Sequence, residues 1–542
     1  MSKATSSGDR VDLGDYDFIV VGAGSAGCVL ANRLSADPKT RVLLLEAGGS
    51  DRYHWIHIPV GYLYCMGNPR TDWGYSTAAE KGLNGRSLAY PRGKVMGGCS
   101  SINGMIYMRG QAADYDGWRQ LGNVGWGWDD VLPLFRRSEN HHGLEGPFHG
   151  QDGELRVEQQ RLSWPILDAV REAAEELGVP KIDDFNDGDN FGSSYFEVTQ
   201  KAGFRFNAVR AFLAPARGRK NLRIVTKAQV QRVRIENGRA TGIDLTCDGR
   251  PARATARREV VLAAGAIGTP QLLQLSGIGP GDLLKRHGID VRLDRPAVGE
   301  NLQDHLQIRT AFRITGARTL NEWQATLFGK AQIALQYALK RSGPMAMAPS
   351  QLGIFMKSDP RFETANIEFH VQPLSLGSFG EPLHPFPAIT VSVCNLRPES
   401  RGSVHITSSD PQAHPAISPN YLSTESDRQV AADSIRAARR LMATERLERH
   451  KPEEFKPGTH IQSDEELAEA AGDIATTIFH PVGTARMGAD ADAVVDPRLR
   501  LRGIKGLRVA DCSIMPTIVS GNTHAPAVMI AEKAAEMIRA GI

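Results

Sequence analysis

The first hydrophobic run of the chain is Phe18-Ile-Val-Val, and it ends at Gly22. A second run, Val42-Leu-Leu-Leu, ends at Glu46. Short continuous apolar runs of this kind are typical of buried strands in a parallel sheet. The pattern predicts a strand over 17–21, a helix over 26–34 and a second strand over 42–46, which together make a βαβ unit.

The rest of the chain alternates between strand-like and helix-like patterns. Asn237-Gly238 separates two strand-like runs and predicts a hairpin turn. Further strands are predicted over 221–226, 230–236, 242–247, 260–265, 366–370, 388–393 and 403–406. Further helices are predicted over 130–138, 165–177, 324–340, 428–443 and 527–538. We expect an α/β (overall α+β) protein in which a second domain interrupts the nucleotide-binding one.

The turn after the first strand carries a nucleotide-binding pattern. Gly22, Gly24 and Gly27 have G-x-G-x-x-G spacing, which permits a tight turn and close approach of the backbone to a pyrophosphate. The following helix start offers unpaired N–H groups to the phosphates. Glu46 follows Gly27 by nineteen residues, where a carboxylate can accept hydrogen bonds from a ribose diol. The combination predicts a bound dinucleotide, whereas the glycines alone would also fit an ordinary turn.

Composition excludes several classes of protein. The chain of 542 residues is 41% hydrophobic and 23% charged, with a net charge of +3 and no long basic block, so nucleic-acid binding is not expected. Six scattered cysteines without a C-x-x-C pair favour a reducing compartment and no zinc site. Residues 1–15 are predicted to be a loose polar tail and not a signal peptide. No apolar run is long enough to span a membrane. We expect a cytoplasmic protein, and peripheral attachment to the inner face of the membrane stays open.

Several further motifs occur in a recognisable order. They are Gly93-Lys-Val-Met-Gly-Gly-Cys-Ser-Ser-Ile-Asn103, Gly265-Ala-Ile-Gly-Thr-Pro270, His480-Pro-Val-Gly-Thr484, Gly506-Leu-Arg-Val-Ala-Asp511 and Gly521-Asn-Thr-His-Ala-Pro526. In these motifs the chain resembles the glucose–methanol–choline oxidoreductases, the flavoenzyme family of choline dehydrogenases and bacterial alcohol dehydrogenases. The resemblance covers residues 17–538.

The resemblance implies a Rossmann-like, discontinuous FAD-binding domain with an inserted substrate domain, which is built on an antiparallel sheet flanked by helices. The FAD-binding domain is expected over 14–157, 205–308 and 465–542, and the substrate domain over 158–204 and 309–464. FAD, and not NAD, is the implied cofactor.

The motif positions also imply the residues that contact FAD. Asp511 would accept a hydrogen bond from the ribityl chain, and the N–H groups of Asn522 and Thr523 at a helix start would stabilise negative charge on the flavin. The complete predicted set is Gly22, Gly24, Ser25, Ala26, Gly27, Glu46, Ala47, Val95, Gly97, Gly98, Asn103, Gly104, Met105, Ile106, Val230, Asp511, Cys512, Asn522 and Thr523. Ile102 stands where covalently flavinylated relatives carry a histidine, so we expect non-covalent FAD.

Two of the fifteen histidines occupy motif positions that imply catalysis. His480 is expected to be the general base toward the substrate hydroxyl, a role that suits imidazole because its ordinary pKa lies near neutrality. His524 is expected to hydrogen-bond the same oxygen. His305 is interpreted as structural, and the pair His141-His142 as part of a solvent loop.

Two polar features receive structural interpretations. Glu368 and His370 share one face of a predicted strand and are interpreted as a polar network, so that no metal site is expected. The segment 320–340 is interpreted as a substrate-domain helix, with a role as a lid or at a membrane surface left open.

The substrate is expected to be a small uncharged primary alcohol. Ile367 is placed where choline oxidases of the family hold a carboxylate, and Phe479 before the base is apolar too. A quinone is favoured over O₂ as electron acceptor. Choline dehydrogenase, hydroxynitrile lyase and a redox-inert FAD protein stay open as alternatives. A fatty-acid photodecarboxylase is disfavoured because His480 is retained.

Overall fold

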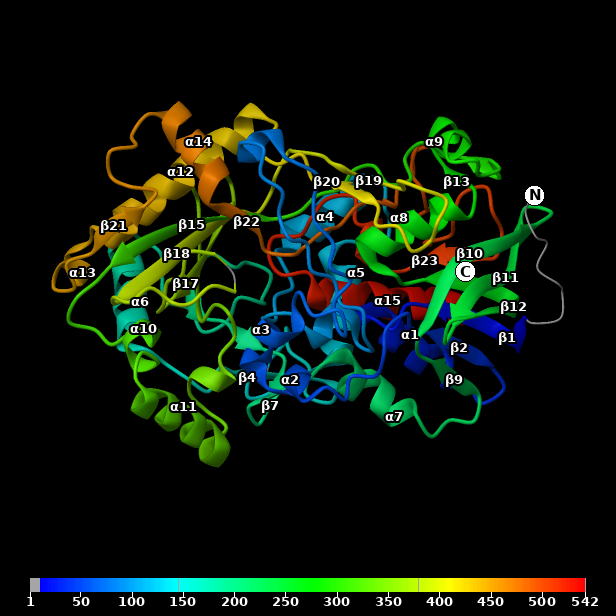
Figure 1. The fold of residues 1–542 in the computed structure, drawn as a ribbon, viewed down its shortest axis with the longest axis horizontal. Coiled ribbons are helices and arrows are strands. Elements are labelled where there is room, and N and C mark those ends of the chain that lie inside the picture. Colours follow the sequence, from blue (N-terminus) through cyan, green and yellow to red (C-terminus); the bar gives the residue numbers. More distant parts are fainter. Residues whose placement is uncertain (1–9, 145, 379, 542) are drawn as a thin grey trace.

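The computed structural model describes residues 10–144, 146–378 and 380–541. Two seven-stranded sheets, each accompanied by helices, lie at opposite ends of the molecule (Figure 1). The α/β fold class predicted from the sequence is confirmed.

The first sheet holds the predicted βαβ unit. Its strands are β1 (Val11–Val21), β2 (Val42–Leu45), β9 (Leu222–Val225), β10 (Ala228–Glu236), β11 (Arg239–Cys247), β12 (Arg250–Leu262) and β23 (Leu507–Val509). The order is β10-β11-β12-β1-β2-β9, with β23 beside β12. β1 pairs in parallel with β2 and β12, whereas β10, β11 and the first part of β12 form an antiparallel meander. Since these strands come from three distant parts of the chain, the nucleotide-binding layer is discontinuous.

Two local predictions in this sheet can be compared with the structure. The hairpin at Asn237-Gly238 is confirmed, with both residues at positive φ and Glu236 opposite Arg239. The prediction of a loose tail over 1–15 is wrong for residues 11–15, because Val11 to Asp15 pair with β12. The part of that tail over 1–9 lies outside the described residues.

The turn after β1 requires glycine at two positions. Gly22 has a φ of 98°, a left-handed conformation that residues with a side chain rarely adopt. A Cβ on Gly27 would lie 1.8 Å from the carbonyl oxygen of Gly22. Helix α1 (Ser25–Leu34) therefore starts directly against the turn, with its first N–H groups next to the loop.

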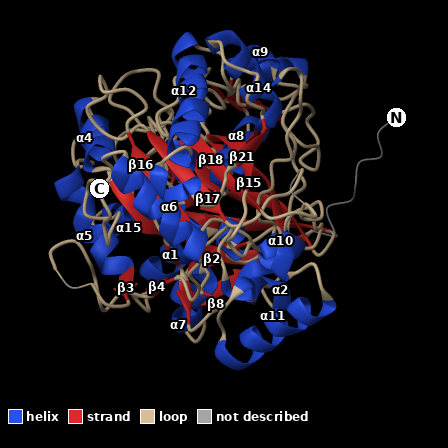
Figure 2. Ribbon diagram, turned by 90° about the vertical axis from the view of Figure 1, so that its left-hand side faces the viewer, coloured by secondary structure: helices blue, strands red, loops and turns tan. Residues whose placement is uncertain are grey.

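The second sheet is antiparallel. Its strands are β5 (Gly192–Tyr195), β15 (Leu306–Arg313), β16 (Leu352–Met356), β17 (Ile367–Gln372), β18 (Ala388–Asn395), β21 (Glu453–Lys456) and β22 (Ala475–Thr477). The order is β21-β15-β18-β17-β16-β5, with β22 beside β15. Helices α6 (Pro165–Glu176) and α12 (Glu425–Met442) cover one face, in front of the strands in Figure 2.

The two faces of this sheet differ in polarity. Ile367, Phe369 and Val371 of β17 pack into the apolar core shared with α6 and α12. Glu368, His370 and Gln372 alternate with them and lie on the opposite face, beside Cys394, Ser392 and Thr390 of β18. The prediction that Ile367 borders the substrate is therefore wrong, because its side chain is directed into the core behind the sheet.

The remaining elements connect the two sheets. The longer helices are α4 (Ala112–Gln120), α5 (Trp128–Ser138), α8 (Gly265–Leu275), α11 (Leu327–Lys340), α14 (Asp464–Ile474) and α15 (His524–Arg539). Short helices are α2 (His54–His57), α3 (Tyr62–Cys65), α7 (Ala214–Ala216), α9 (Gly281–Arg286), α10 (Leu320–Trp323) and α13 (Glu445–Glu448). Short strands are β3 (Glu139–His141), β4 (Leu155–Gln159), β6 (Glu197–Val198), β7 (Gln200–Lys201), β8 (Phe204–Arg205), β13 (Ile278–Gly279), β14 (Leu293–Asp294), β19 (Ser403–His405) and β20 (Ala416–Ser418).

The helix predicted over 324–340 is α11, which begins three residues later than predicted, and the short helix α10 precedes it. The break falls before Thr326, whose Oγ1 accepts the N–H of Gly329 at 3.0 Å and caps α11. The strand predicted over 403–406 is β19, which pairs with β20 in a small sheet of its own.

Candidate functional site

A cavity of about 1060 Å³ runs from the turn after β1 to the polar face of the second sheet. Its lining includes Gly24 and Ser25 from the turn after β1, His480 and Asn522, and Gln307 and Arg309 from β15 of the second sheet. This length suits an extended dinucleotide with a second molecule beyond it.

Most of the residues predicted to contact FAD line this cavity. Those that do are Gly22, Gly24, Ser25, Ala26, Glu46, Ala47, Gly98, Asn103, Gly104, Met105, Ile106, Val230, Asp511, Cys512, Asn522 and Thr523. Gly27, Val95 and Gly97 do not line it. Gly27 supports the turn, Val95 is buried in an apolar cluster, and the N–H of Gly97 donates to Ala23 O at 2.7 Å.

The two glycine loops pack against each other. A Cβ on Gly98 would lie 2.7 Å from Cα of Gly24, so the segment Gly98–Ser101 reaches the phosphate-binding turn only because it lacks a side chain there. Asn103 is fixed nearby, since its Oδ1 accepts from Arg205 Nη1 at 2.7 Å and from Met105 N at 3.0 Å.

Glu46 and Asp511 are buried carboxylates at the cavity wall. Glu46 accepts the N–H groups of Ala23 at 3.0 Å and Gly48 at 2.8 Å, while burial raises its pKa to about 7. Asp511 accepts from Gly265 N, Thr269 Oγ1 and Ser513 N, and burial raises its pKa as well. An ionised carboxylate offers about four lone-pair positions, so each retains capacity for a hydroxyl donor of a nucleotide.

His480 is held in one tautomer by a chain of hydrogen bonds. The carbonyl oxygen of Leu396 can only accept, so His305 must donate to it from Nε2, 3.1 Å away. His305 Nδ1 is then the acceptor for His480 Nδ1, also at 3.1 Å. The remaining nitrogen of His480, Nε2, keeps its lone pair and accepts from Asn522 Nδ2 at 3.1 Å.

Burial keeps this imidazole neutral. Desolvation, followed by the neighbouring His305 and His370, lowers the pKa of His480 well below its ordinary value. The backbone of His480 is anchored too, because its N–H donates to Asp304 Oδ1 at 2.7 Å. Asp304 Oδ2 accepts from Tyr90, Tyr421 and Thr477. The arrangement presents a fixed basic nitrogen beside an amide donor.

The structure does not bring His524 to His480. His524 Nδ1 lies 2.9 Å from Ser25 Oγ, next to the turn that precedes α1. Burial lowers its pKa to about 4. Asn522, predicted from the motif only as a flavin contact, holds the position expected for His524. His305, interpreted as structural, contacts His480 directly.

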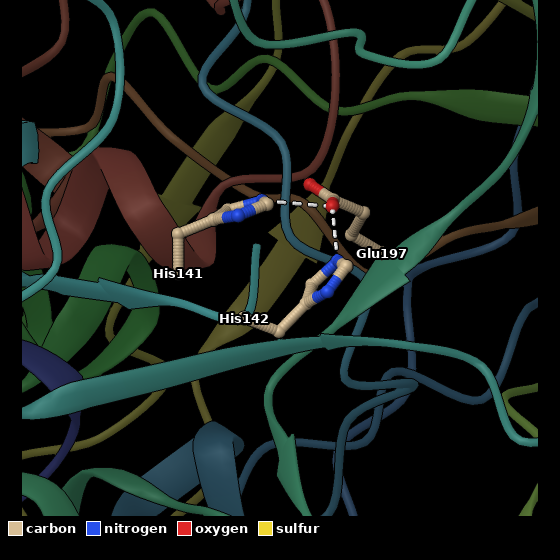
Figure 3. A group of neighbouring side chains, drawn as sticks. All are labelled: His141, His142 and Glu197. Carbon is tan, nitrogen blue, oxygen red and sulfur yellow. Dashed lines mark hydrogen bonds and ion pairs between the residues drawn. The ribbon is translucent and has the colours of Figure 1, made fainter. Parts of the chain in front are cut away.

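A second histidine cluster lies outside the cavity. Figure 3 shows the rings of His141 and His142 directed at one oxygen of Glu197, with Nε2–Oε1 distances of 2.8 and 3.1 Å. The interpretation of His141 as part of a solvent loop is wrong, because it is buried. Its Nδ1 accepts the N–H groups of Gly143 and Leu144, so its Nε2 carries the proton and has no lone pair for a metal.

The polar group on β17 and β18 is buried at the cavity wall, where His370 lines the cavity. His370 Nε2 lies 3.2 Å from Glu368 Oε1, and Cys394 is next to them. Burial raises the pKa of the Cys394 thiol well above its ordinary value. The two carboxylate oxygens of Glu368 and Nε2 of His370 form no hydrogen bond with a described residue, so the polar network expected from the sequence is not closed by hydrogen bonds.

Helix α11 presents apolar side chains to solvent near the far end of the cavity. Leu327 is 86% exposed, Phe328 72%, Leu335 59% and Leu339 73%. On its inner side, Ile333 lines the cavity. Among the described residues, no helix combines the length and the hydropathy that a membrane crossing needs.

Comparison with known proteins identifies consistent relatives. Two family models described as GMC oxidoreductase match residues 16–307 and 398–531. An alcohol dehydrogenase [acceptor] of Pseudomonas putida is 41% identical over 527 residues, which is 96% of this chain and 95% of the relative. The mitochondrial choline dehydrogenase of Homo sapiens is 41% identical over 547 residues, 99% and 92% of the two chains. The R554A variant of a formate oxidase from Aspergillus oryzae RIB40, studied for FAD modification, superposes with a TM-score of 0.90. It is 28% identical, with 98% and 99% of the two chains covered.

Proposed function

The chain belongs to the GMC oxidoreductase family, and from this premise we propose that His480 is the base with which it oxidises a primary alcohol to an aldehyde. The protein is an FAD-dependent oxidoreductase acting on CH–OH donors. The observation that carries the proposal is the unprotonated Nε2 of His480, whose lone pair accepts from the amide of Asn522 at 3.1 Å and would accept from a substrate hydroxyl in its place.

His480 and Asn522 have different roles at the hydroxyl group of the substrate. When FAD is bound, it supplies the acceptor for the hydride that leaves the carbinol carbon. His480 Nε2 takes the hydroxyl proton, while its Nδ1–H stays bonded to His305 and prevents the ring from turning. Asn522 Nδ2 donates to the same oxygen and stabilises the charge that grows there.

The cavity fits FAD. The turn at Gly22–Gly27 is packed so closely that a Cβ on Gly22 or Gly27 would meet backbone atoms, and its glycines let a pyrophosphate approach the backbone. Glu46, directly after β2, is placed to bind a ribose. We propose that FAD forms no covalent bond at the position of Ile102 in the Gly93–Asn103 motif, because Ile102 has no nucleophilic atom and belongs to an apolar cluster with Ile56 and Val95. Acid precipitation should leave the yellow colour in the supernatant. A yellow pellet would overturn this point.

We also propose that electrons pass to a quinone-like acceptor at a lipid surface, in preference to O₂. Leu327, Phe328, Leu335 and Leu339 form an exposed apolar row on α11, and Lys330 and Lys340 on the same helix suit anionic headgroups. Phe328→Glu should reduce co-sedimentation with anionic vesicles. Val124→Glu, a change at a residue 80% exposed elsewhere, should not.

The experiment that tests the activity is anaerobic mixing with a panel of primary alcohols. Flavin bleaching in the dark, followed by reduction of an added dye, is the expected result. A hydroxynitrile lyase or a redox-inert FAD protein would stay yellow with every alcohol. Repeating the panel with oxygen alone compares the two acceptors.

A further inference from the structure

Arg309 is a cation at the substrate end of the cavity, and the phenol of Tyr62 lies within range of its charge. Arg309 lies on β15, with Gln307 on the same face, and both line the cavity. No described carboxylate forms an ion pair with Arg309, and no described acceptor takes a hydrogen bond from it. Burial of the Arg309 side chain lowers the pKa of its guanidinium.

The other arginines of the cavity wall are satisfied by the protein. Arg86 donates to the carbonyl oxygens of Gly472 and Ala475 at 2.6 and 3.0 Å. Arg92 donates to the carbonyl oxygens of Pro91 and Phe479 at 2.6 and 2.7 Å. These two guanidiniums hydrogen-bond to loop carbonyl groups, whereas Arg309 forms no hydrogen bond with a described residue.

The surroundings of Arg309 are positive. Lys456 lies on the neighbouring strand β21, where it pairs with Ala311 of β15, and its Nζ donates to Gly377 O at 3.3 Å. Burial, and next the charge of Arg309, lower the pKa of Lys456. Two acidic side chains line this region. Glu381 binds the N–H of Ser378, and Asp473 binds Asn84.

The position of Arg309 fits the remote end of a bound alcohol. His305, which contacts the base, lies four residues earlier at the start of β15. A strand rises by about 3.3 Å per residue, so the two backbone positions are roughly 13 Å apart. Apolar side chains line this part of the cavity, among them Leu374, Met347 and Ile333.

A cation removed from water is normally paired. We propose that Arg309 binds a carboxylate at the end of the substrate remote from the carbinol, so that the protein oxidises hydroxy-carboxylates with an apolar spacer. This assignment rests on the proposed alcohol oxidation and names its substrate class. It replaces the expectation of an uncharged substrate, whose argument placed Ile367 at the site. The quaternary ammonium of choline would meet like charge here.

Matched substrates test the proposal. The measurement is kcat/KM, with a dye acceptor, for ω-hydroxy-carboxylates and for n-alkanols of equal chain length. The wild-type protein should favour the acids, and Arg309→Met should lower kcat/KM for the acids by about 30-fold or more while changing that for the alkanols little. Arg309→Lys should recover part of the loss.

Arg313→Met is the matched control. Arg313 lies on the same strand, is exposed, stacks on Phe386 and does not line the cavity, so its removal should leave both substrate classes unchanged. Inhibition of the wild-type protein gives a second measurement that needs no variant. Hexanoate should compete with hexanol, and hexyltrimethylammonium should not.

The experiments separate a failure of the Arg309 assignment from a failure of the proposed alcohol oxidation. If alkanols bleach the flavin, but the ratio between acid and alkanol is the same in wild type and Arg309→Met, the assignment to Arg309 is overturned and the oxidation stands. Absence of inhibition by hexanoate would overturn it too. If neither substrate class bleaches the flavin, the proposed oxidation itself is overturned.

Discussion

The amide nitrogen of Asn522 lies 3.1 Å from Nε2 of His480. This contact joins the loop before α15 to the segment that follows β22, two parts of the chain anchored in different sheets. A basic nitrogen and an N–H donor therefore face the same point in the cavity. A substrate hydroxyl suits this point, because it can donate its proton to His480 and accept a hydrogen bond from Asn522.

Asn522→Ala should slow flavin reduction by a primary alcohol by about 10²–10³-fold, because one donor to the developing alkoxide is lost. His480 and its contact with His305 would be untouched. Anaerobic stopped-flow absorbance measures the rate. Val124→Ala, at a residue 80% exposed and outside the cavity lining, serves as control. An Asn522→Ala rate equal to wild type would remove Asn522 from the reaction.

His305→Ala should slow flavin reduction by a primary alcohol, because Nδ1–H of His480 loses its acceptor and the ring is free to turn. Anaerobic stopped-flow absorbance measures the rate. A His305→Gln variant, which keeps an acceptor for Nδ1–H, should restore much of the rate. An unchanged rate in His305→Ala would make His305 a structural residue only.

Gly27→Ala should abolish FAD retention. Its Cβ would meet the Gly22 carbonyl oxygen at 1.8 Å and force the phosphate-binding turn apart. Gly117→Ala is the matched control, because Gly117 is also within a helix but has nothing within 4 Å of the added carbon. The ratio of flavin to protein absorbance after desalting reports the outcome. Full flavin content in Gly27→Ala would contradict the assignment of this turn.

Burial of His524 as a neutral ring should make stability fall in acid. Its folded pKa is about 4, below the ordinary value of 6.5, so between these values the unfolded chain binds a proton that the folded chain does not. The contribution to the free energy of unfolding is therefore complete above pH 6.5 and is lost as the pH falls toward 4. At pH 5 the loss is about 2 kcal/mol. His524→Asn should lose correspondingly less between pH 7 and pH 5 in urea titrations. Equal losses in the two proteins would show that His524 is not buried as a neutral group.

The sequence predicts the helices and strands better than it predicts which way individual side chains point. Continuous apolar runs located β2 and the end of β1 because a buried parallel strand needs apolar residues on both faces. β1 begins six residues earlier than predicted, at Val11, where the chain is more polar. The Gly521–Pro526 motif contains both Asn522 and His524. Which of the two faces His480 depends on where α15 begins, and a motif does not fix that.

The placement of Ile367 failed for a related reason. The alternation of Ile367, Phe369 and Val371 with Glu368, His370 and Gln372 is visible in the sequence. It defines two faces, and the apolar one must pack on helices, so the polar face was the better choice for the site. The burial of His141 had no such local signal, since its partner Glu197 lies 56 residues away.

The proposed reaction depends on removal of the hydroxyl proton by His480. The rate of anaerobic flavin reduction by a primary alcohol in His480→Gln tests this step, measured on protein shown to hold a full complement of FAD. The expected rate is roughly 10²–10⁴-fold below wild type. Reduction at the wild-type rate would exclude His480 as the base.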